Sequence, residues 1–282
     1  MITSYAVLND DSEFVIAYYL ANDKNELRFP LFASRLDKKT GQWQNRELND
    51  VKVVTQGTGT IWDGHSMDCI GSVLSVKEYR RRYYLNLHFN PSAGCLLILT
   101  SDLTIDQTLP GGVEEFVDGR LLWSMDMVHF ADVHPEEIWI YDPNTYKSSI
   151  IYPQPNDLFR KNYEERLAQV IDQKKCMANN WACDPKRFTS NIDAIEVNEQ
   201  TNSFAFNVRF EPEGFLTREE AENSGKWDDD DYVYVYKLNP VRWRAFSVYD
   251  LKAKFGTDSL LELLSPEKLR LVFPPSELLL SN

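Results

Sequence analysis

The sequence is short of positive charge. Its 282 residues include 30 Lys and Arg against 43 Asp and Glu, which gives a net charge of −13 at pH 7. Proteins that bind nucleic acids need clustered basic side chains for the phosphates, so this balance argues against a nucleic-acid partner. It favours a protein partner with a basic surface, whose approach the acidic chain would steer. The one tight basic cluster, Arg80–Arg82, is interpreted as a solvated hairpin turn, with a phosphate cradle as the alternative.

Long apolar runs are also missing. No stretch of 18 apolar residues occurs, which excludes a transmembrane helix and argues against membrane insertion. Residues Met1–Tyr5 have neither the basic region nor the apolar core of a signal peptide. The sequence as read therefore predicts a cytoplasmic protein, and export remains the alternative if a signal peptide has been removed.

Cysteine is scarce, at four residues. Cys69 and Cys95 lie in apolar, strand-like runs and are interpreted as small buried apolar side chains. Cys176 and Cys183 are too widely spaced for a zinc knuckle. A local disulfide between these two, in an exported protein, is the less favoured hypothesis.

Motifs of several common enzymes are absent. Gly57-Thr58-Gly59 lacks the third glycine and the following helix of a dinucleotide loop, and neither GxSxG nor HExxH occurs. We therefore expect no cofactor and no metal site. The four adjacent carboxylates of Asp228–Asp231 could attract Ca²⁺. However, calcium loops space their ligands on alternate positions and include a glycine, so a solvated loop is the favoured interpretation.

What the sequence does have is alternation with a period of two, which is typical of strands. Phe204, Phe206, Val208 and Phe210, for example, are separated by Ala205, Asn207 and Arg209. The runs at residues 138–141 and 232–236 are apolar at every position, as expected of strands that are covered on both faces. Turn residues such as those of 37–41 separate the strands, which indicates an all-β fold.

Four-strand units can be recognised at about residues 3–50, 65–110, 113–153 and 190–250. Within the third unit, the stretch from Ile138 to Thr145 is similar to the third strand and turn of a β-propeller blade. The chain resembles a β-propeller in this pattern over nearly its whole length. We expect one domain over residues 1–282, an all-β propeller of four to five four-stranded blades with helical insertions. A large β-sandwich or barrel is the alternative.

Two segments break the strand pattern, near residues 156–175 and 215–225. The first places apolar residues on one helical face and can be capped by Asn156 or Asp157. The second has a capping-box pattern and ends at Gly225. We expect both helices to cover sheet edges.

The C-terminal segment predicts one more helix or turn, which begins at Ser265-Pro266-Glu267. Short apolar stretches follow at residues 272–273 and 278–280. We expect these to be strands that complete a fifth blade or pair with the N-terminal strand to close a ring.

The candidate site is the stretch Trp62–Asp68, which precedes the apolar run 69–76. If that run is the innermost strand of a blade, the stretch lies at the rim of a central channel. Carboxylates from separate blades could then converge there, namely Asp63, Asp68, Glu114 and Asp193. A pair of carboxylates is what a glycoside hydrolase needs. Trp62 and His65 are candidate binding residues, and the alternative is an ordinary solvated turn.

Two functions follow from these patterns. The favoured hypothesis is a non-enzymatic ligand- or protein-binding propeller, because the strand pattern comes with no catalytic motif. The alternative is a carbohydrate-active enzyme or a glycan-binding protein that uses the four carboxylates. The seven tryptophans could stack on sugars, although such residues more often fill the core of an all-β protein.

Overall fold

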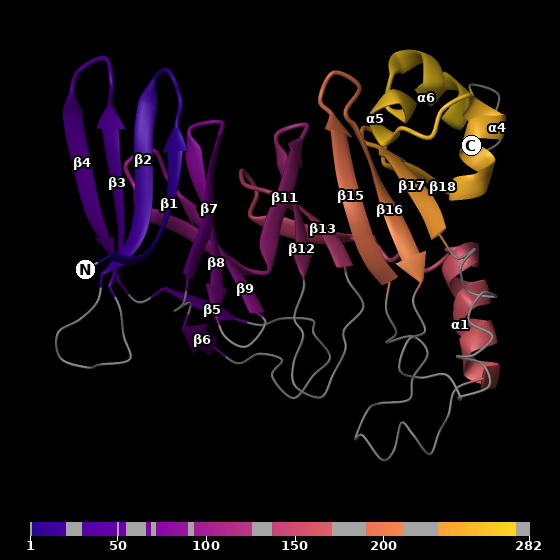
Figure 1. Ribbon diagram of the computed structural model, residues 1–282, viewed down its shortest axis with the longest axis horizontal. Coiled ribbons are helices and arrows are strands. Elements are labelled where there is room, and N and C mark those ends of the chain that lie inside the picture. Colours follow the sequence, from indigo (N-terminus) through magenta and orange to yellow (C-terminus); the bar gives the residue numbers. More distant parts are fainter. Residues whose placement is uncertain are drawn as a thin grey trace. The chain divides into compact units, whose positions relative to one another are not determined.

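A computed structural model shows a mostly β protein (Figure 1). The structure describes residues 2–20, 30–49, 51–54, 66–68, 72–89, 93–125, 137–170, 190–210 and 231–274. None of the helices in this part of the chain is long and apolar enough to cross a membrane.

Most of the strands form four sheets, each with four strands in sequence order. The first contains β1 (Ile2–Asn9), β2 (Glu13–Leu20), β3 (Leu31–Asp37) and β4 (Gln42–Leu48). The second contains β7 (Ser72–Tyr79), β8 (Arg82–Phe89), β9 (Ala93–Leu99) and β10 (Ile105–Pro110). The third contains β11 (Gly112–Val117), β12 (Arg120–Met125), β13 (Glu137–Asp142) and β14 (Lys147–Tyr152). The fourth contains β15 (Ser190–Asn198), β16 (Ser203–Phe210), β17 (Asp231–Lys237) and β18 (Arg242–Ser247).

Each sheet is a four-stranded meander, which is the construction of a β-propeller blade. The all-β prediction and the division into four-strand units are confirmed, whereas a sandwich would divide the strands between two sheets. One boundary differs, because the second sheet begins at Ser72 and not near residue 65. The residues before it form β6 (Ser66–Asp68), which pairs with β5 (Lys52–Val54) in a separate small sheet.

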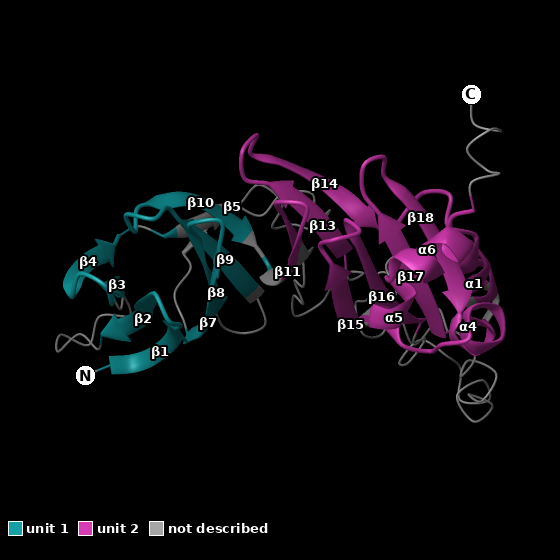
Figure 2. Cartoon of the chain, turned by 90° about the horizontal axis from the view of Figure 1, so that it is seen from above, with its two compact units in different colours: residues 1–113, 124–132 teal, residues 114–123, 133–282 magenta. Residues whose placement is uncertain are grey.

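The chain divides into two compact units (Figure 2). Unit 1 comprises residues 1–113 and 124–132, and unit 2 comprises residues 114–123 and 133–282. Unit 1 contains the first two sheets, and unit 2 contains the fourth sheet and most of the third. The expectation of one domain over residues 1–282 stays a prediction.

In unit 1 the first sheet buries one of its faces against the second sheet. Val15 and Ala17 on this inner face are fully buried, and Tyr19 is 1% exposed. The backbone N–H of Val73 on β7 donates to the Ser4 hydroxyl on β1, at 2.9 Å. Apolar burial and this hydrogen bond together hold the two sheets in contact.

In unit 2 strand β17 is covered on both faces, as the sequence predicted. Tyr234 and Tyr236 lie in one core cluster with residues of the third sheet and α1. Val233 and Val235 point to the opposite face and lie in a second cluster with the C-terminal helices. Because successive side chains of a strand alternate, one strand contributes to both cores.

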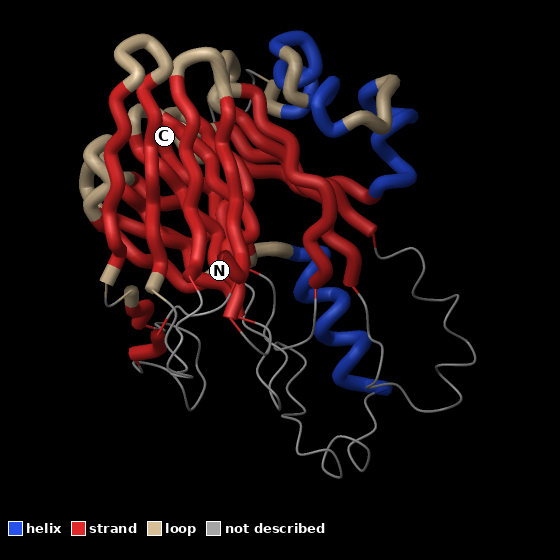
Figure 3. The backbone as a smooth tube through the Cα atoms, turned by 60° about the vertical axis from the view of Figure 1, so that its left-hand side comes forward, coloured by secondary structure: helices blue, strands red, loops and turns tan. Residues whose placement is uncertain are grey.

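The helices of unit 2 cover parts of its sheets (Figure 3). Within the described residues these helices are α1 (Leu158–Val170), α4 (Val248–Phe255), α5 (Leu260–Leu263) and α6 (Pro266–Val272). The helix predicted near 156–175 is confirmed as α1, and Asp157 caps it by accepting from the backbone N–H of Phe159 at 3.0 Å. The segment near 215–225 lies outside the described residues.

At the C-terminus one prediction is confirmed and one is wrong. Ser265 begins α6 with Pro266 in its first turn, and its hydroxyl accepts from the N–H of Lys268. The strand expected at residues 272–273 is instead the end of this helix, because Val272 and Phe273 bury their side chains with α4 and α5 against the fourth sheet. Residues 278–280 lie outside the described part, and no fifth four-stranded sheet occurs within it.

The β7–β8 connection is a two-residue hairpin turn, as predicted for the basic cluster. Arg80 and Arg81 have φ values of 49° and 65°. Left-handed conformations of this kind favour glycine and asparagine, so two consecutive arginines strain the turn. The Arg81 N–H donates to the Glu78 carboxylate, and Arg82 forms an ion pair with Asp106 at 3.1 Å.

Candidate binding surface

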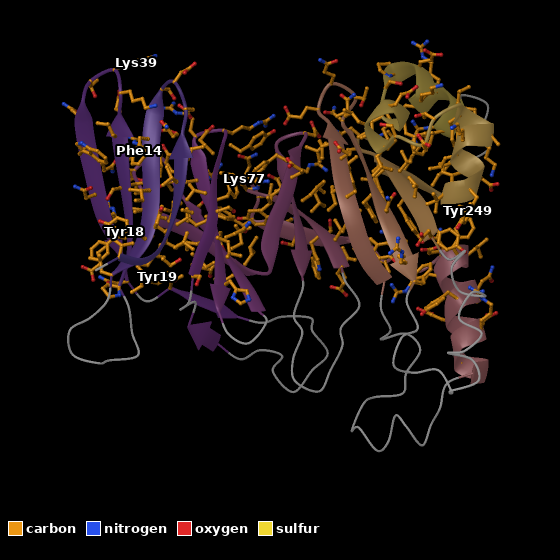
Figure 4. All side chains as sticks on the ribbon, in the orientation of Figure 1. Phe14, Tyr18, Tyr19, Lys39, Lys77 and Tyr249 are labelled. Carbon is orange, nitrogen blue, oxygen red and sulfur yellow. The ribbon has the colours of Figure 1, made fainter. Side chains whose placement is uncertain are left out.

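The second face of the first sheet is the most unusual surface that the structure describes. Residues opposite one another in the strand register point to the same side of a sheet, which defines this face. We call it the aromatic face, and its twelve residues form three rows across the sheet: Tyr5, Tyr18, Phe32 and Glu47; Val7, Ile16, Ser34 and Asn45; Asn9, Phe14, Leu36 and Trp43. Phe14 and Tyr18 on β2 are labelled in Figure 4.

The aromatic face is open to solvent. Tyr5 is 62% exposed, Trp43 is 55% exposed and Val7 is 40% exposed. Phe14 and Tyr18 are half-buried by their neighbours in the sheet. No described strand of unit 1 covers these side chains. Contiguous exposed apolar surfaces are uncommon on soluble proteins and mark sites of interaction.

The amino-acid sequence of β2 is typical of a strand that is buried on both faces, so the exposure of one of its faces is unusual. All its positions from Phe14 to Leu20 are apolar or aromatic, which is typical of a strand covered on both faces. The same pattern in β17 comes with two buried faces. In β2 only the inner face is buried among the described residues of unit 1.

The rings of the aromatic face pack against one another. Tyr18 and Phe32 are cross-strand neighbours with ring centroids 5.5 Å apart and an interplanar angle of 16°. Phe14 and Trp43 meet edge to face, with centroids 6.1 Å apart. These contacts direct ring faces at neighbouring rings within the face.

A polar network on the inner face fixes the first sheet on the second. The Tyr83 hydroxyl on β8 donates to the Glu13 carboxylate on β2 at 2.5 Å, and Arg35 on β3 donates to the carbonyl of Ser101 at 2.7 Å. Burial and the hydrogen bond to Glu13 raise the pKa of Tyr83 to about 12. The phenol therefore stays protonated and keeps donating at physiological pH.

Unit 2 contains a second group of titratable residues, at the start of α1. Asp157 caps the helix and accepts from the Tyr234 hydroxyl, and Arg160 donates to Glu164 at 2.8 Å. Burial raises the pKa of Glu137, which accepts from the indole N–H of Trp139 at 2.9 Å. Each of these carboxylates already has a donor from the protein. The hydrogen bond from Tyr234 to Asp157 holds the start of α1 against the fourth sheet.

The carboxylates predicted to converge stay untested as a site. Asp68 lies in β6, where its backbone pairs with Lys52 and not with a blade strand. Glu114 lies in β11 and Asp193 in β15, on the first strands of the third and fourth sheets. Trp62, Asp63 and His65 lie outside the described residues. The convergence of these carboxylates stays a prediction, because the structure describes only the backbone positions of Asp68, Glu114 and Asp193.

The predicted calcium loop is only partly described. Asp231, its last residue, begins β17 and forms an ion pair with Arg209 at 2.9 Å. The other three aspartates lie outside the described residues. Within the described ranges, no group of three or more His, Cys, Asp or Glu residues is arranged to hold a metal ion.

One cysteine differs from its interpretation. Cys95 on β9 is fully buried, as expected, but it is also disulfide-bonded. Its partner must be Cys69, Cys176 or Cys183, and all three lie outside the described residues. The spacing of the cysteines in the sequence contains no signal for this bond, because strand pairing brings together residues that are distant in the chain.

Comparisons with known proteins add little to this picture. No protein-family model matches the sequence, and no curated protein matches it. Among solved structures, the β-propeller domain of the Trilobed protease from Pyrococcus furiosus has 6% identity and a TM-score of 0.31 over 85% of this chain and 70% of that one. The GH74 xyloglucanase from Xanthomonas campestris has 10% identity and a TM-score of 0.31, and the match covers 87% of this chain and 38% of the xyloglucanase. The tricorn protease also has 10% identity and a TM-score of 0.31, and the match covers 96% of this chain and 26% of the protease.

The chain thus spans less than half the length of the last two proteins. All three TM-scores are too low to carry an argument, so the assignment of the sheets as propeller blades rests on their own strand order. The class that the fold defines is a β-propeller-like protein.

Proposed function

We propose that this chain is a non-enzymatic binding protein and that the aromatic face of its first sheet binds another polypeptide. The observation that supports this function is the exposure of Tyr5 and Trp43 on a face with eight apolar or aromatic residues among its twelve. A few residues carry most of the binding energy at protein interfaces, and Trp and Tyr are enriched among them. Burying Trp43 and its neighbours would stabilise a complex without any chemical step.

The arrangement of the rings favours a polypeptide over a sugar as the ligand. A platform for sugars needs flat rings with free faces, but Tyr18 and Phe32 stack on one another. Rings whose faces are occupied in this way still offer apolar contact area to the side chains of a partner, as in the core between two stacked sheets. A glycan-binding surface is the second candidate function, and the exposure of the Trp43 indole is the observation that favours it.

The disulfide at Cys95 supports an exported protein over a cytoplasmic one. Disulfides persist in oxidising compartments and are reduced in the cytosol. Cys95 is fully buried within the second sheet, which is typical of a structural disulfide.

Site-specific photo-crosslinking tests the binding function. A benzophenone amino acid in place of Tyr5 should give a covalent adduct with a polypeptide under ultraviolet light, in extracts or in the purified protein. The same amino acid in place of Tyr249 is the matched control, because Tyr249 is also a tyrosine, is 63% exposed and lies on α4.

The adduct at position 5 should be lost when Trp43 is also changed to Ala, because both side chains belong to the same face. An equal yield of adducts at position 249, or no adduct at position 5, would contradict the proposal. Binding to a glycan array that Trp43→Ala abolishes would favour the second candidate function.

A further inference from the structure

We infer that the occupant of the aromatic face is a second copy of this chain, so that two first sheets pack face to face around a twofold axis. This inference rests on the proposed function and names the partner of the same surface. In a twofold interface the same patch serves both subunits, so the patch must be complementary to itself. The aromatic face meets that condition in charge and in size.

The charge of the face favours a like partner. Of its twelve residues only Glu47 is charged, although the whole chain has a net charge of −13. A basic partner would find almost no carboxylates on this face with which to pair. A second copy would place the aromatic and aliphatic side chains of the two faces against each other, and Glu47 would be the one charged residue that each copy contributes.

The size of the face matches a stable interface. Four strands of seven or eight residues make a sheet roughly 20 Å wide and roughly 25 Å long. Such a face has a projected area of roughly 500 Å². Side chains that stand out from the sheet add to this area, so the face approaches the value of about 800 Å² that each partner contributes to an interface of standard size. Two stacked sheets of this kind form a core about 10 Å thick.

In the fourth sheet, the apolar face that does not contact the third sheet is covered by helices. Val233 and Val235 on that face are buried by Leu251, Phe255 and other residues of α4–α6. The described residues of unit 1 include no helix that could cover the first sheet in this way. The free edge at β4 is protected differently, because Arg46 and Glu47 are charged and exposed there and disfavour strand-to-strand pairing. The open face, and not this edge, is therefore suited to contact a second copy.

Sedimentation equilibrium of the full chain tests the inference. We expect a reversible dimer, with Tyr5→Lys raising the dimer dissociation constant about tenfold or more, since a charge would be buried without a partner. Tyr249→Lys is the matched control and should leave the constant within about twofold. Circular dichroism of both variants checks that they fold.

The salt dependence separates a second copy from a basic partner. Two chains of charge −13 repel, so raising NaCl from about 0.05 M to about 0.5 M should tighten the dimer by screening. A complex with a basic partner would weaken instead.

A monomer at every concentration up to about 0.5 mM, or a dimer unaffected by Tyr5→Lys, would overturn the inference. If the position-5 adduct contains a different polypeptide, the binding function stands and the second copy is excluded. If position 5 gives no polypeptide adduct, both proposals fail.

Discussion

Tyr83 and Glu13 join the first two sheets across 70 positions of the chain, through a hydrogen bond from the phenol to the carboxylate. Tyr83 is 2% exposed. Its ring packs between the two sheets, and its hydroxyl donates a hydrogen bond to the carboxylate of Glu13. This pair shows how unit 1 combines apolar packing with charged contacts between its sheets.

Changing Tyr83 to Phe should lower the free energy of unfolding by about 1–2 kcal/mol, because Glu13 loses its donor while the packing of the ring is kept. Urea denaturation measures this change. Tyr5→Phe is the control, since that side chain is 62% exposed, and it should be nearly neutral. Equal effects of the two substitutions would contradict the role of the hydrogen bond.

Alkaline pH should destabilise the protein through the same residue. The pKa values of Tyr83 and Tyr84 are both raised from 10.0 to about 12, mainly by burial. A raised folded-state pKa means that the folded state holds the proton more tightly than the unfolded state does. The stability from these groups is therefore present below pH 10 and is lost as the pH rises from 10 to 12. The decrease should be smaller in Tyr83→Phe, as pH-dependent urea titrations will show.

The strained turn gives a stabilising substitution. Replacing Arg80 by Asn and Arg81 by Gly should raise the free energy of unfolding by about 1 kcal/mol, because these residues accept positive φ readily. Thermal denaturation measures the change. A control pair, Arg80→Gln and Arg81→Gln, removes the same charges and keeps the strain, so it should not stabilise. Stabilisation by both pairs would show that charge is responsible.

Gly94 on β9 should not tolerate a side chain. A Cβ at this position would lie 2.9 Å from the carbonyl oxygen of Gly111, and the Gly111 N–H donates to the Gly94 carbonyl at 2.8 Å. Because the obstacle is backbone, Gly94→Ala should destabilise unit 1 by about 1–3 kcal/mol. An unchanged denaturation midpoint in urea would show that the two segments can separate without cost.

The disulfide at Cys95 predicts a pattern of alkylation. In denaturant without a reductant, Cys95 should resist iodoacetamide, and after reduction it should react. Peptide mapping of the unreduced protein identifies its partner among the other three cysteines. Alkylation of Cys95 in the unreduced, denatured protein would contradict the bond and the proposed oxidising compartment.

The blades were predictable because their signals are local. Alternation and turn residues such as Asp37, which accepts from the N–H groups of Lys39 and Thr40, mark each strand without reference to the rest of the chain. The helix α4 also had a local signal that the sequence analysis missed. Leu251 and Phe255 are four residues apart, and Gly256 ends the helix with a φ of 73°.

The binding surface was not predictable in the same way. Alternation in β2 shows two apolar faces, but it does not show which face another sheet covers. The proposed carboxylate site depended on treating residues 65–110 as one blade. Asp68 instead pairs in a small separate sheet, since β5 supplies a partner strand that lies outside the repeat. Which face of β2 is buried and which strand pairs with β6 both depend on segments that are distant in the sequence.

The order of elements in the fourth sheet has a consequence for synthesis. The ribosome synthesises β15–β18 before α4–α6. Val233 and Val235 are therefore not covered by these helices until the helices have been synthesised. A chain that is truncated before Phe273 lacks part of this helical cover and exposes apolar residues of the fourth sheet. Such exposed apolar surface promotes aggregation with neighbouring nascent chains on a polysome.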